Sequence, residues 1–230
     1  MPDANLLPLE EAASRLGTLL DDVVFVGGAT LALLITDPGA APVRATVDVD
    51  VIAEITTYME YFDFSERLRQ RGFKEDSGEH PLNCRWIHGK LILDVMPTEN
   101  GILGSINRWY KDALKLAQIV SLPSGTAIRV IDVPHFLGTK FEAFRGRGNH
   151  DFSASRDLED VVAVIDGREV ILEELAAAPP ELRRYLAEAV GQLLSESRFL
   201  EVLPGYFLPD DISQQRVPGM LGKLGKIAAT

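Results

Sequence analysis

The stretch Val47-Asp48-Val49-Asp50-Val51 places two carboxylates one residue apart inside an apolar run. Because side chains alternate between the two faces of a strand, Asp48 and Asp50 are predicted to point the same way, about 6–7 Å apart. A third acidic residue, Asp94, interrupts a second apolar run, Leu91-Ile92-Leu93-Asp94-Val95. On neighbouring strands the three would form a cup of oxygen atoms that suits Mg²⁺. Two such ions about 4 Å apart can stabilise the attacking and leaving oxygens of a phosphoryl-type displacement, so the pattern indicates a reaction class.

A purely structural interpretation competes with this one. Asp48 and Asp50 would also fit the solvent face of a half-buried strand. Asp94 is harder to explain in this way, because a buried and unpaired carboxylate costs free energy. A metal ion, a basic partner or a position at the end of the strand would each relieve that cost. The sequence leaves these three explanations open.

The composition is that of a globular protein. The chain has 230 residues, enough for one medium domain or for a compact domain with a helical extension. Hydrophobic residues make up 46% and charged residues 25%, so a proper core is expected. The sequence shows neither an early apolar run suited to a signal peptide nor about twenty apolar residues suited to a membrane span. Its single cysteine, Cys84, excludes an internal disulfide. We therefore expect a cytoplasmic protein with no membrane partner.

The charge is strongly acidic but unevenly distributed. A net charge of −11 and an isoelectric point near 4.8 argue against a broad nucleic-acid-binding surface. One segment is locally basic and would bind a polyanion only locally, while bound metal ions would reverse the sign of a carboxylate-lined cleft. The basic residues of that segment are Lys140, Arg145, Arg147 and Arg156.

A glycine pair follows the first predicted strand. The short run Val23–Val26 is rich in β-branched residues and ends at Gly27-Gly28, and Ala29 to Ile35 reads as a helix. Such a junction leaves backbone N–H groups free at a helix start, where phosphate oxygens bind well. A tight turn without a ligand is the commoner explanation for two glycines.

The remaining pattern predicts a mixed α/β half followed by a helical half. We place a mixed α/β core at residues 1–133 and a C-terminal helical region at residues 134–230, whose glycine-rich end is expected to be loosely ordered. The other predicted elements are helices at 9–20, 62–71, 106–116, 134–145, 155–165, 171–177 and 181–200, and strands at 48–51, 73–74, 84–87, 90–96 and 128–131.

Four motifs in this order resemble a known group of enzymes. Gly27-Gly28-Ala29-Thr30-Leu31-Ala32-Leu33 and Arg44-x-Thr46-x-Asp48-x-Asp50 resemble the opening motifs of nucleotidyltransferases in the DNA polymerase β superfamily. Phe136 to Arg147 is similar to the lysine helix of the narrower AbiEii/AbiGii group, which includes the MenT toxins of toxin–antitoxin pairs. Arg156-Asp157-Leu158-Glu159-Asp160-Val161 is similar to the Arg-Asp-x-x-Asp segment of that group. The resemblance spans Phe25 to Ile165.

Two features depart from the superfamily pattern. Gly28 stands where much of the superfamily has serine, although the AbiEii group commonly shows glycine. The loop between Leu34 and Arg44 is longer than expected, and would either shape the entrance for an acceptor or form an inserted surface loop. Neither departure removes a carboxylate.

The resemblance implies a nucleotidyltransferase fold, with a mixed β-sheet flanked by helices and a C-terminal helical region. It also implies that Asp48, Asp50 and Asp94 hold Mg²⁺, with Mn²⁺ as the alternative, and that Asp94 serves as a base. The nucleoside triphosphate would be the substrate, with its phosphates in the Gly27-Gly28 turn. The residues implied to bind the nucleotide are Gly27, Gly28, Thr30, Arg44, Thr46 and Lys140.

The C-terminal motifs are also assigned roles by the resemblance. Lys140 would contact the triphosphate, and either Asp157 or Asp160 would order that lysine or the active-site water. Each residue also has a plain structural explanation: a lysine in a helix is usually solvated, and a cap with a surface ion pair contributes little. Arg44, in turn, would simply neutralise the nearby aspartates.

The function implied by the resemblance is transfer of a nucleoside monophosphate from a triphosphate to an acceptor. The group suggests RNA as the acceptor, especially the 3′ end of tRNA, and a toxin with a cognate antitoxin protein. The acidic chain would better fit a rival acceptor, either a protein or a small cationic molecule such as an aminoglycoside. A third hypothesis is a nucleotide-binding protein that keeps the fold without turnover.

Overall fold

The computed structural model describes residues 5–78, 83–104, 106–147 and 151–230. The chain forms two compact units. Unit 1 comprises Met1–Ala32 and Arg44–Asp132, and unit 2 comprises Leu33–Val43 and Val133–Thr230. Residues 33–43, a segment within the first half of the sequence, therefore group with the C-terminal helices.

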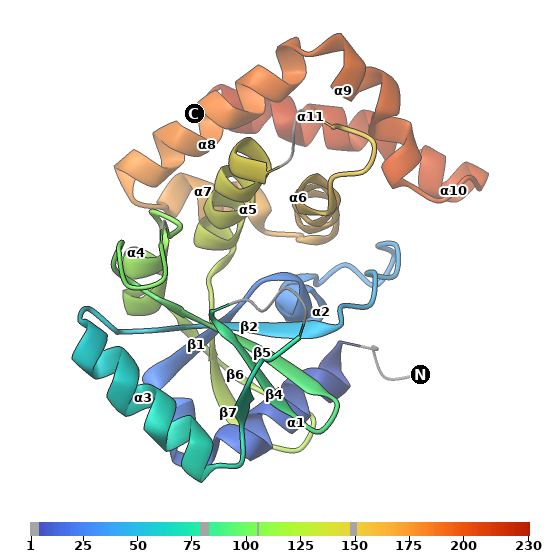
Figure 1. Cartoon of the computed structure of the whole chain (residues 1–230). Helices are drawn as coiled ribbons and strands as arrows, with labels where there is room; N and C mark the ends of the chain where they lie inside the picture. Colours follow the sequence, from blue (N-terminus) through green and yellow to red (C-terminus); the bar gives the residue numbers. More distant parts are fainter. Residues whose placement is uncertain (1–4, 79–82, 105, 148–150) are drawn as a thin grey trace. The chain divides into compact units, whose positions relative to one another are not determined.

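Unit 1 is built around a seven-stranded mixed β-sheet (Figure 1). The strand order is β3-β4-β5-β2-β1-β7-β6. The pairs β2/β5 and β1/β7 are parallel, and the other neighbouring pairs are antiparallel. The central strands are apolar, which fits their position inside the sheet. The strands are β1 (Val23–Val26), β2 (Asp48–Ala53), β3 (Lys74–Glu75), β4 (Arg85–His88), β5 (Leu91–Pro97), β6 (Gln118–Ser121) and β7 (Ala127–Val130).

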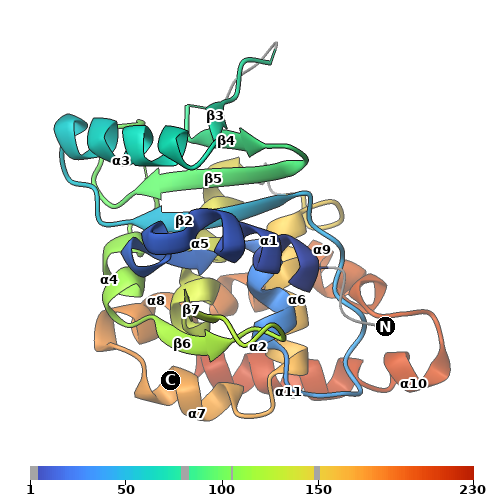
Figure 2. The same cartoon turned by 90° about the horizontal axis from the view of Figure 1, so that it is seen from below.

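Helices cover the sheet of unit 1. Helix α1 packs against β2 and β5, and Figure 2 shows it in front of the strands. Helix α3 contacts β4 through Arg69, whose guanidinium lies over the Trp86 ring at 5.5 Å. Because side chains alternate along β4, this contact leaves Arg85 on the opposite face of the sheet. The helical segments of unit 1 are α1 (Leu6–Leu16), η1 (Gly17–Asp22), η2 (Gly28–Thr30), α3 (Tyr58–Gln70) and α4 (Tyr110–Lys115), and α2 (Leu31–Leu34) leads into unit 2.

Several predicted elements of unit 1 differ in length from those observed. The helix predicted over 29–35 is a 3₁₀ turn followed by the single turn α2, so the prediction of a full helix is wrong. The helix predicted over 106–116 is confirmed only for Tyr110–Lys115. Strand β6, which pairs with β7, was not predicted; it lies at the sheet edge and Ile119 is exposed.

Unit 2 is helical. Its core is formed by helices α5, α6, α8 and α11, which contact one another in pairs. Phe136, Leu158, Leu186 and Leu224 are among the fully buried apolar residues of this core. The helical segments are α5 (Val133–Arg147), α6 (Arg156–Gly167), α7 (Ile171–Ala177), α8 (Pro180–Ser195), α9 (Ser197–Val202), η3 (Leu203–Tyr206), α10 (Asp211–Gln214) and α11 (Val217–Ala228).

The C-terminal part of unit 2 corrects two predictions. The helix predicted over 181–200 is interrupted at Glu196, whose backbone is extended, so that α8 and α9 are separate. The glycine-rich end, expected to be loosely ordered, is helix α11. Met220, Leu224 and Ile227 form a buried stripe on that helix. Burial of this stripe offsets the poor helix propensity of the glycines.

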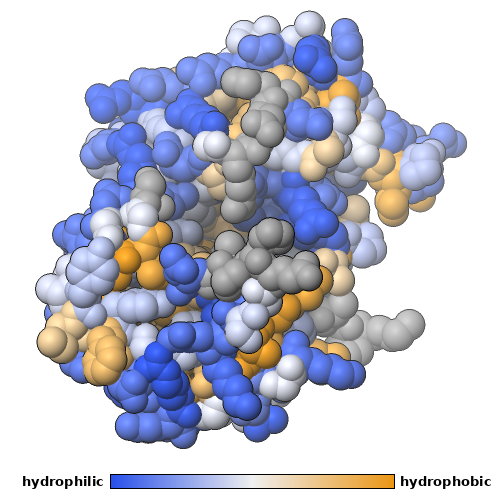
Figure 3. Space-filling model, in the orientation of Figure 1, coloured by the Kyte–Doolittle hydropathy of each residue, from blue (hydrophilic) through white to orange (hydrophobic). Residues whose placement is uncertain are grey.

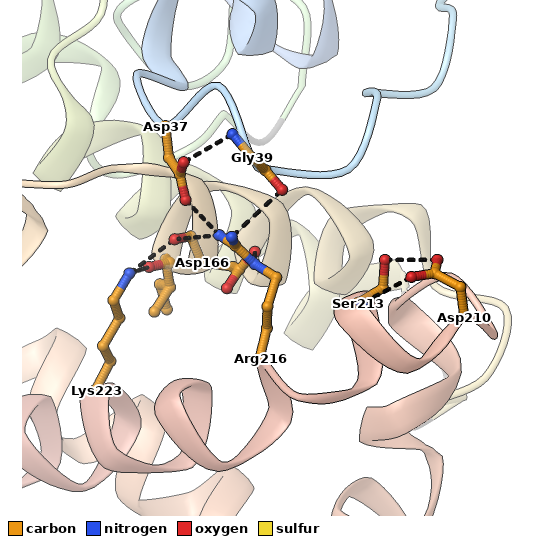
Figure 4. Close-up of polar contacts among 8 residues, drawn as sticks. Asp37, Gly39, Asp166, Asp210, Ser213, Arg216 and Lys223 are labelled. Carbon is orange, nitrogen blue, oxygen red and sulfur yellow. Dashed lines mark hydrogen bonds and ion pairs between the residues drawn. The ribbon is translucent and has the colours of Figure 1, made fainter.

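A cluster of hydrogen bonds and ion pairs links residues 33–43 to the C-terminal helices of unit 2 (Figure 4). The Arg216 guanidinium donates to the Asp37 carboxylate at 2.6 Å and to the Asp166 carboxylate at 2.8 Å. Lys223 donates to the backbone carbonyls of Ile165 and Asp166 at 2.9 and 2.7 Å, near the end of α6. These contacts explain why the segment groups with residues more than a hundred positions later.

The face of the molecule seen in Figure 3 is mainly hydrophilic, with separate apolar areas. Near the start of α3, Tyr58, Met59 and Phe62 are exposed. Of the helices in the described ranges, none combines the length and the apolar character that crossing a lipid bilayer requires.

Candidate active site

The three predicted carboxylates of unit 1 lie on two adjacent strands. Strands β2 and β5 are parallel neighbours in which Asp50 is paired with Asp94 and Asp48 with Ile92. Paired residues on neighbouring strands point to the same face, and Asp48 lies two residues before Asp50, so all three side chains share one face. The Asp48 side chain is 38% exposed, whereas that of Asp94 is only 8% exposed. The face therefore carries one accessible and one deeply buried carboxylate.

Arg85 is the basic partner of the buried carboxylate. It lies opposite Asp94 in the antiparallel pair of β4 and β5. Its Nε donates to Asp94 Oδ1 at 2.8 Å and its Nη2 to Asp94 Oδ2 at 2.7 Å, a bidentate arrangement that matches the guanidinium fork. The same Nη2 donates to Asp48 Oδ2 at 2.8 Å. Hydrogen bonds to Asp94 raise the pKa of Arg85 above its ordinary value, so the guanidinium stays charged. Of the three explanations for Asp94, the basic partner is observed.

The glycine turn lies directly against Asp50. Gly27 has φ of +72°, a left-handed conformation, and a Cβ at this position would lie 2.0 Å from Asp50 Oδ2. Only glycine therefore fits without moving the carboxylate. The buried Thr30 hydroxyl donates to the Gly27 carbonyl at 2.8 Å and fixes the turn. The predicted phosphate site relied on free backbone N–H groups at the start of a full helix. Since α2 has only one turn, the part of that prediction that remains is the backbone of the turn around Gly28.

Asn5 fixes the segment that leads into β2. The side chain of Asn5 is fully buried. Its Nδ2 donates to the Arg44 carbonyl at 2.9 Å, and its Oδ1 accepts the Thr46 N–H at 2.9 Å. Arg44 and Thr46, both predicted to bind nucleotide, are thus held by their backbone just before Asp48. The structure brings them to the same unit as the glycine turn and the carboxylates.

Cys84 directly precedes β4 and lies within reach of the charge of Asp94. Burial raises the pKa of its thiol to about 11, and the negative charge of Asp94 adds to the effect. The thiol is therefore neutral at pH 7. Its side chain is half-buried.

The donor set of this face fits a hard divalent cation. The carboxylate oxygens of Asp48, Asp50 and Asp94 are the ligands that Mg²⁺ prefers. As the side chains stand, however, no three His, Cys, Asp or Glu side chains within the described ranges are gathered closely enough to hold a metal ion. Arg85 already occupies both oxygens of Asp94 and one oxygen of Asp48, Oδ2.

The remaining predicted residues form an ion triad inside unit 2. Lys140 on α5 contacts Asp160 Oδ2 at 2.6 Å and Asp157 Oδ1 at 3.2 Å, both on α6. All three are less than 9% exposed. The solvated lysine and the surface ion pair that the sequence left open are therefore not observed. Ser155 caps α6 by accepting the Leu158 N–H at 3.3 Å, which fixes the helix that carries both aspartates.

Sequence reasoning missed Arg85 and Asn5. The signal for Arg85 was available, because it lies in the strand predicted over 84–87, next to the strand of Asp94 across a tight turn. Hairpin pairing would have brought it close to Asp94, although without fixing the exact register. Asn5 had no such signal, since its partners Arg44 and Thr46 are about forty residues away.

The comparisons with known proteins concern the fold. No family profile matches the chain, and no curated protein matches it in sequence. An antigenic nucleotidyltransferase-like protein from Paracoccidioides brasiliensis is 19% identical, with a TM-score of 0.51 over 87% of this chain and 93% of that chain. An H. pylori protein, provisionally named a nucleotidyltransferase, is 13% identical, with a TM-score of 0.50 over 100% of this chain and 95% of that chain. The predicted mixed sheet flanked by helices is confirmed, and the chain has a nucleotidyltransferase-like fold.

Proposed function

We propose that this chain is a nucleotidyltransferase that transfers a nucleoside monophosphate from a triphosphate to an acceptor hydroxyl. The observation that carries the proposal is the shared face of β2 and β5, where Asp48, Asp50 and Asp94 lie together. The close approach of Asp50 to the Gly27 turn supports it, because this turn is where the resemblance puts the phosphates. The nucleotidyltransferase-like fold supports the same reaction class.

The proposed reaction is a displacement at the α-phosphorus. The acceptor oxygen forms a new bond to that phosphorus, the bond to the bridging oxygen of the β-phosphate breaks, and pyrophosphate leaves. Mg²⁺, or Mn²⁺ in its place, would be held by Asp48 and Asp50 and would supply charge neutralisation and alignment when bound. Asp94 would accept the proton of the acceptor hydroxyl at a carboxylate oxygen. The backbone N–H groups of the Gly27-Gly28 turn would bind phosphate oxygens.

The acceptor that we propose is RNA, in particular the 3′ end of tRNA, in keeping with a toxin of the AbiEii/AbiGii type that has a cognate antitoxin. This part of the proposal rests on the resemblance of the four motifs. A small cationic molecule or a protein is the second candidate, and the net charge of −11 favours it because an acidic surface attracts cations. The role of Lys140 at the triphosphate stays a prediction.

The test is a transfer assay with Mg²⁺ and each α-labelled nucleoside triphosphate. Total RNA, purified tRNA, an aminoglycoside panel and a protein extract are offered separately as acceptors. Variants Asp48→Asn and Asp50→Asn remove one charge each at nearly constant shape. Asp63→Asn, an exposed carboxylate on α3, is the matched control.

Label on tRNA that is lost in Asp48→Asn and Asp50→Asn but kept in Asp63→Asn supports the whole proposal. Label on a small molecule or protein alone supports the transferase and replaces the acceptor. Triphosphate binding without transfer to any acceptor contradicts the enzymatic proposal and favours a binding protein. Growth arrest on expression, abolished by the same two substitutions, tests the toxin role.

A further inference from the structure

We propose that Arg85 competes with the divalent cation for the carboxylates of β2 and β5. In this account Arg85 holds Asp48 and Asp94 together while no metal is bound, and releases Asp48 when the cation arrives. Arg85 is then a positioning residue that sets the affinity for metal. The inference rests on the proposed metal-dependent function and adds to it a residue that the four motifs do not include.

The Arg85 guanidinium binds Asp94 and Asp48 in different ways. Asp94 is bound by two guanidinium nitrogens, Nε and Nη2, and each takes a different carboxylate oxygen. Asp48 is bound only through Nη2, which it shares with Asp94. The contact to Asp48 is therefore the weaker of the two, and its loss leaves the bidentate pair intact.

The difference in burial between Asp48 and Asp94 also indicates that Asp48 is the carboxylate that Arg85 releases. The Asp48 side chain is 38% exposed, so water and incoming cations reach it, whereas that of Asp94 is 8% exposed. A buried carboxylate that lost its partner would carry a large desolvation cost, but an exposed one would be rehydrated. The contact between Arg85 and Asp48 is therefore the one that can break when a cation binds.

Charge balance fixes the direction of the effect. Arg85 brings one positive charge to the carboxylates of Asp48 and Asp94. Without that charge the carboxylates would attract a divalent cation more strongly. Removal of Arg85 also removes the group that occupies Asp48. Both effects predict that a variant without the guanidinium binds metal more tightly.

The experiment is a Mn²⁺ titration of the full chain, read from the electron paramagnetic resonance signal of free Mn²⁺, without nucleotide or acceptor. The variants are Arg85→Met and the control Arg69→Met. Arg69 also pairs with two carboxylates, Glu66 and Glu75, but those lie on α3 and β3. We expect a dissociation constant lowered at least about tenfold in Arg85→Met and unchanged in Arg69→Met. The melting temperature of Arg85→Met should also rise more on Mn²⁺ addition than that of the unchanged protein.

A second pair of variants keeps the test valid if Arg85→Met does not fold. Asp94→Asn and the double variant Arg85→Met/Asp94→Asn both remove the buried charge of Asp94, so neither leaves an unpaired buried carboxylate. Asp48 and Asp50 remain in both. The double variant should bind Mn²⁺ at least about tenfold more tightly than Asp94→Asn, because only Asp94→Asn keeps the guanidinium at Asp48.

The outcomes separate this inference from the proposed function. If the unchanged protein binds Mn²⁺ and Arg85→Met binds it equally or more weakly, competition by Arg85 is refuted and the proposed transferase stands. If no variant binds Mn²⁺, competition by Arg85 is refuted, and the transfer assay, in which the triphosphate is present, decides separately on the transferase. If Arg85→Met binds more tightly but no acceptor is ever labelled in the transfer assay, the competition is supported and the transferase is not.

Discussion

Gly27 and Gly89 share one backbone feature and differ in what surrounds them. Both have positive φ, +72° and +62°, but an added Cβ meets Asp50 at Gly27 and finds no atom within 4 Å at Gly89. Substitution by alanine should therefore cost both variants about 1–2 kcal/mol of left-handed strain. Only Gly27→Ala should also displace the carboxylate.

We expect both alanine variants to lose stability in urea denaturation, Gly27→Ala more than Gly89→Ala because its Cβ must also displace Asp50, while only Gly27→Ala loses nucleotide transfer. Gly89→Ala is the matched control for backbone strain. Full transfer activity in a folded Gly27→Ala protein would show that the contact between the turn and Asp50 has no role in the reaction.

Lys140 stabilises the fold of unit 2 as a buried cation. Its ammonium group lies between two buried carboxylates, Asp157 and Asp160. Replacing it with methionine would leave both without their cation, which typically costs about 3–5 kcal/mol. Urea denaturation should show this loss for Lys140→Met and a far smaller loss for Lys111→Met, which removes an exposed pair with Glu99. A Lys140→Met protein as stable as the unchanged chain would contradict the buried triad.

Cys84 offers a direct test of burial near the carboxylates. With a pKa of about 11, on the order of one thiol in a thousand is ionised at pH 8. The alkylation rate should rise about tenfold from pH 8 to 9 and again from pH 9 to 10, because only the thiolate reacts. Reduced glutathione, measured in parallel, should level off earlier. A plateau for Cys84 near pH 9 would mean that the thiol is exposed and far from negative charge.

At the scale of elements, the strands with clear apolar runs were predictable and the weak helices were not. Strands β1, β2, β4 and β5 lie close to their predicted positions. Each is an apolar run in the sequence that is bounded by turn residues, which is the usual signal of a strand. Helix α11 was missed because glycine is a poor helix former. The buried stripe of Met220, Leu224 and Ile227, a tertiary effect, decides its conformation.

Arg216 at the start of α11 should contribute to stability in a pH-dependent way. The hydrogen bond from Arg216 lowers the pKa of Asp37 below its ordinary value. A carboxyl group with a lowered folded-state pKa stabilises the fold above its unfolded pKa, about 3.9, and this contribution disappears as the pH falls through the lower folded value.

The measurement compares the unfolding free energy of Arg216→Met with that of the unchanged chain from pH 7 down to pH 3. We expect a loss of about 1–3 kcal/mol at pH 7 that narrows below about pH 4. Arg198→Met, at an exposed position on α9, should change stability by less than about 0.5 kcal/mol. If the difference in unfolding free energy between the two proteins stays constant to pH 3, the ion pair of Arg216 with Asp37 is not its source.

At the scale of the whole chain, the sequence predicted the kind of fold and most of the candidate residues, but not how residues 33–43 group. That segment belongs to unit 2 because Asp37 bonds to Arg216, a contact across 179 positions that no local pattern reveals. Asp48, Asp50 and Asp94 could be predicted to share a face, because strand alternation is a local rule. Arg85 required the register of β4 against β5, which single-sequence reasoning rarely fixes.

The central claim is that the face shared by Asp48, Asp50 and Asp94 supports nucleotidyl transfer. Its most direct test is Mg²⁺-dependent pyrophosphate release from nucleoside triphosphates in the presence of tRNA, measured for the unchanged chain, Asp50→Asn and Asp63→Asn. The account predicts release by the unchanged chain and by Asp63→Asn, and a loss of at least about a hundredfold in Asp50→Asn. Equal release by a folded Asp50→Asn protein would contradict it.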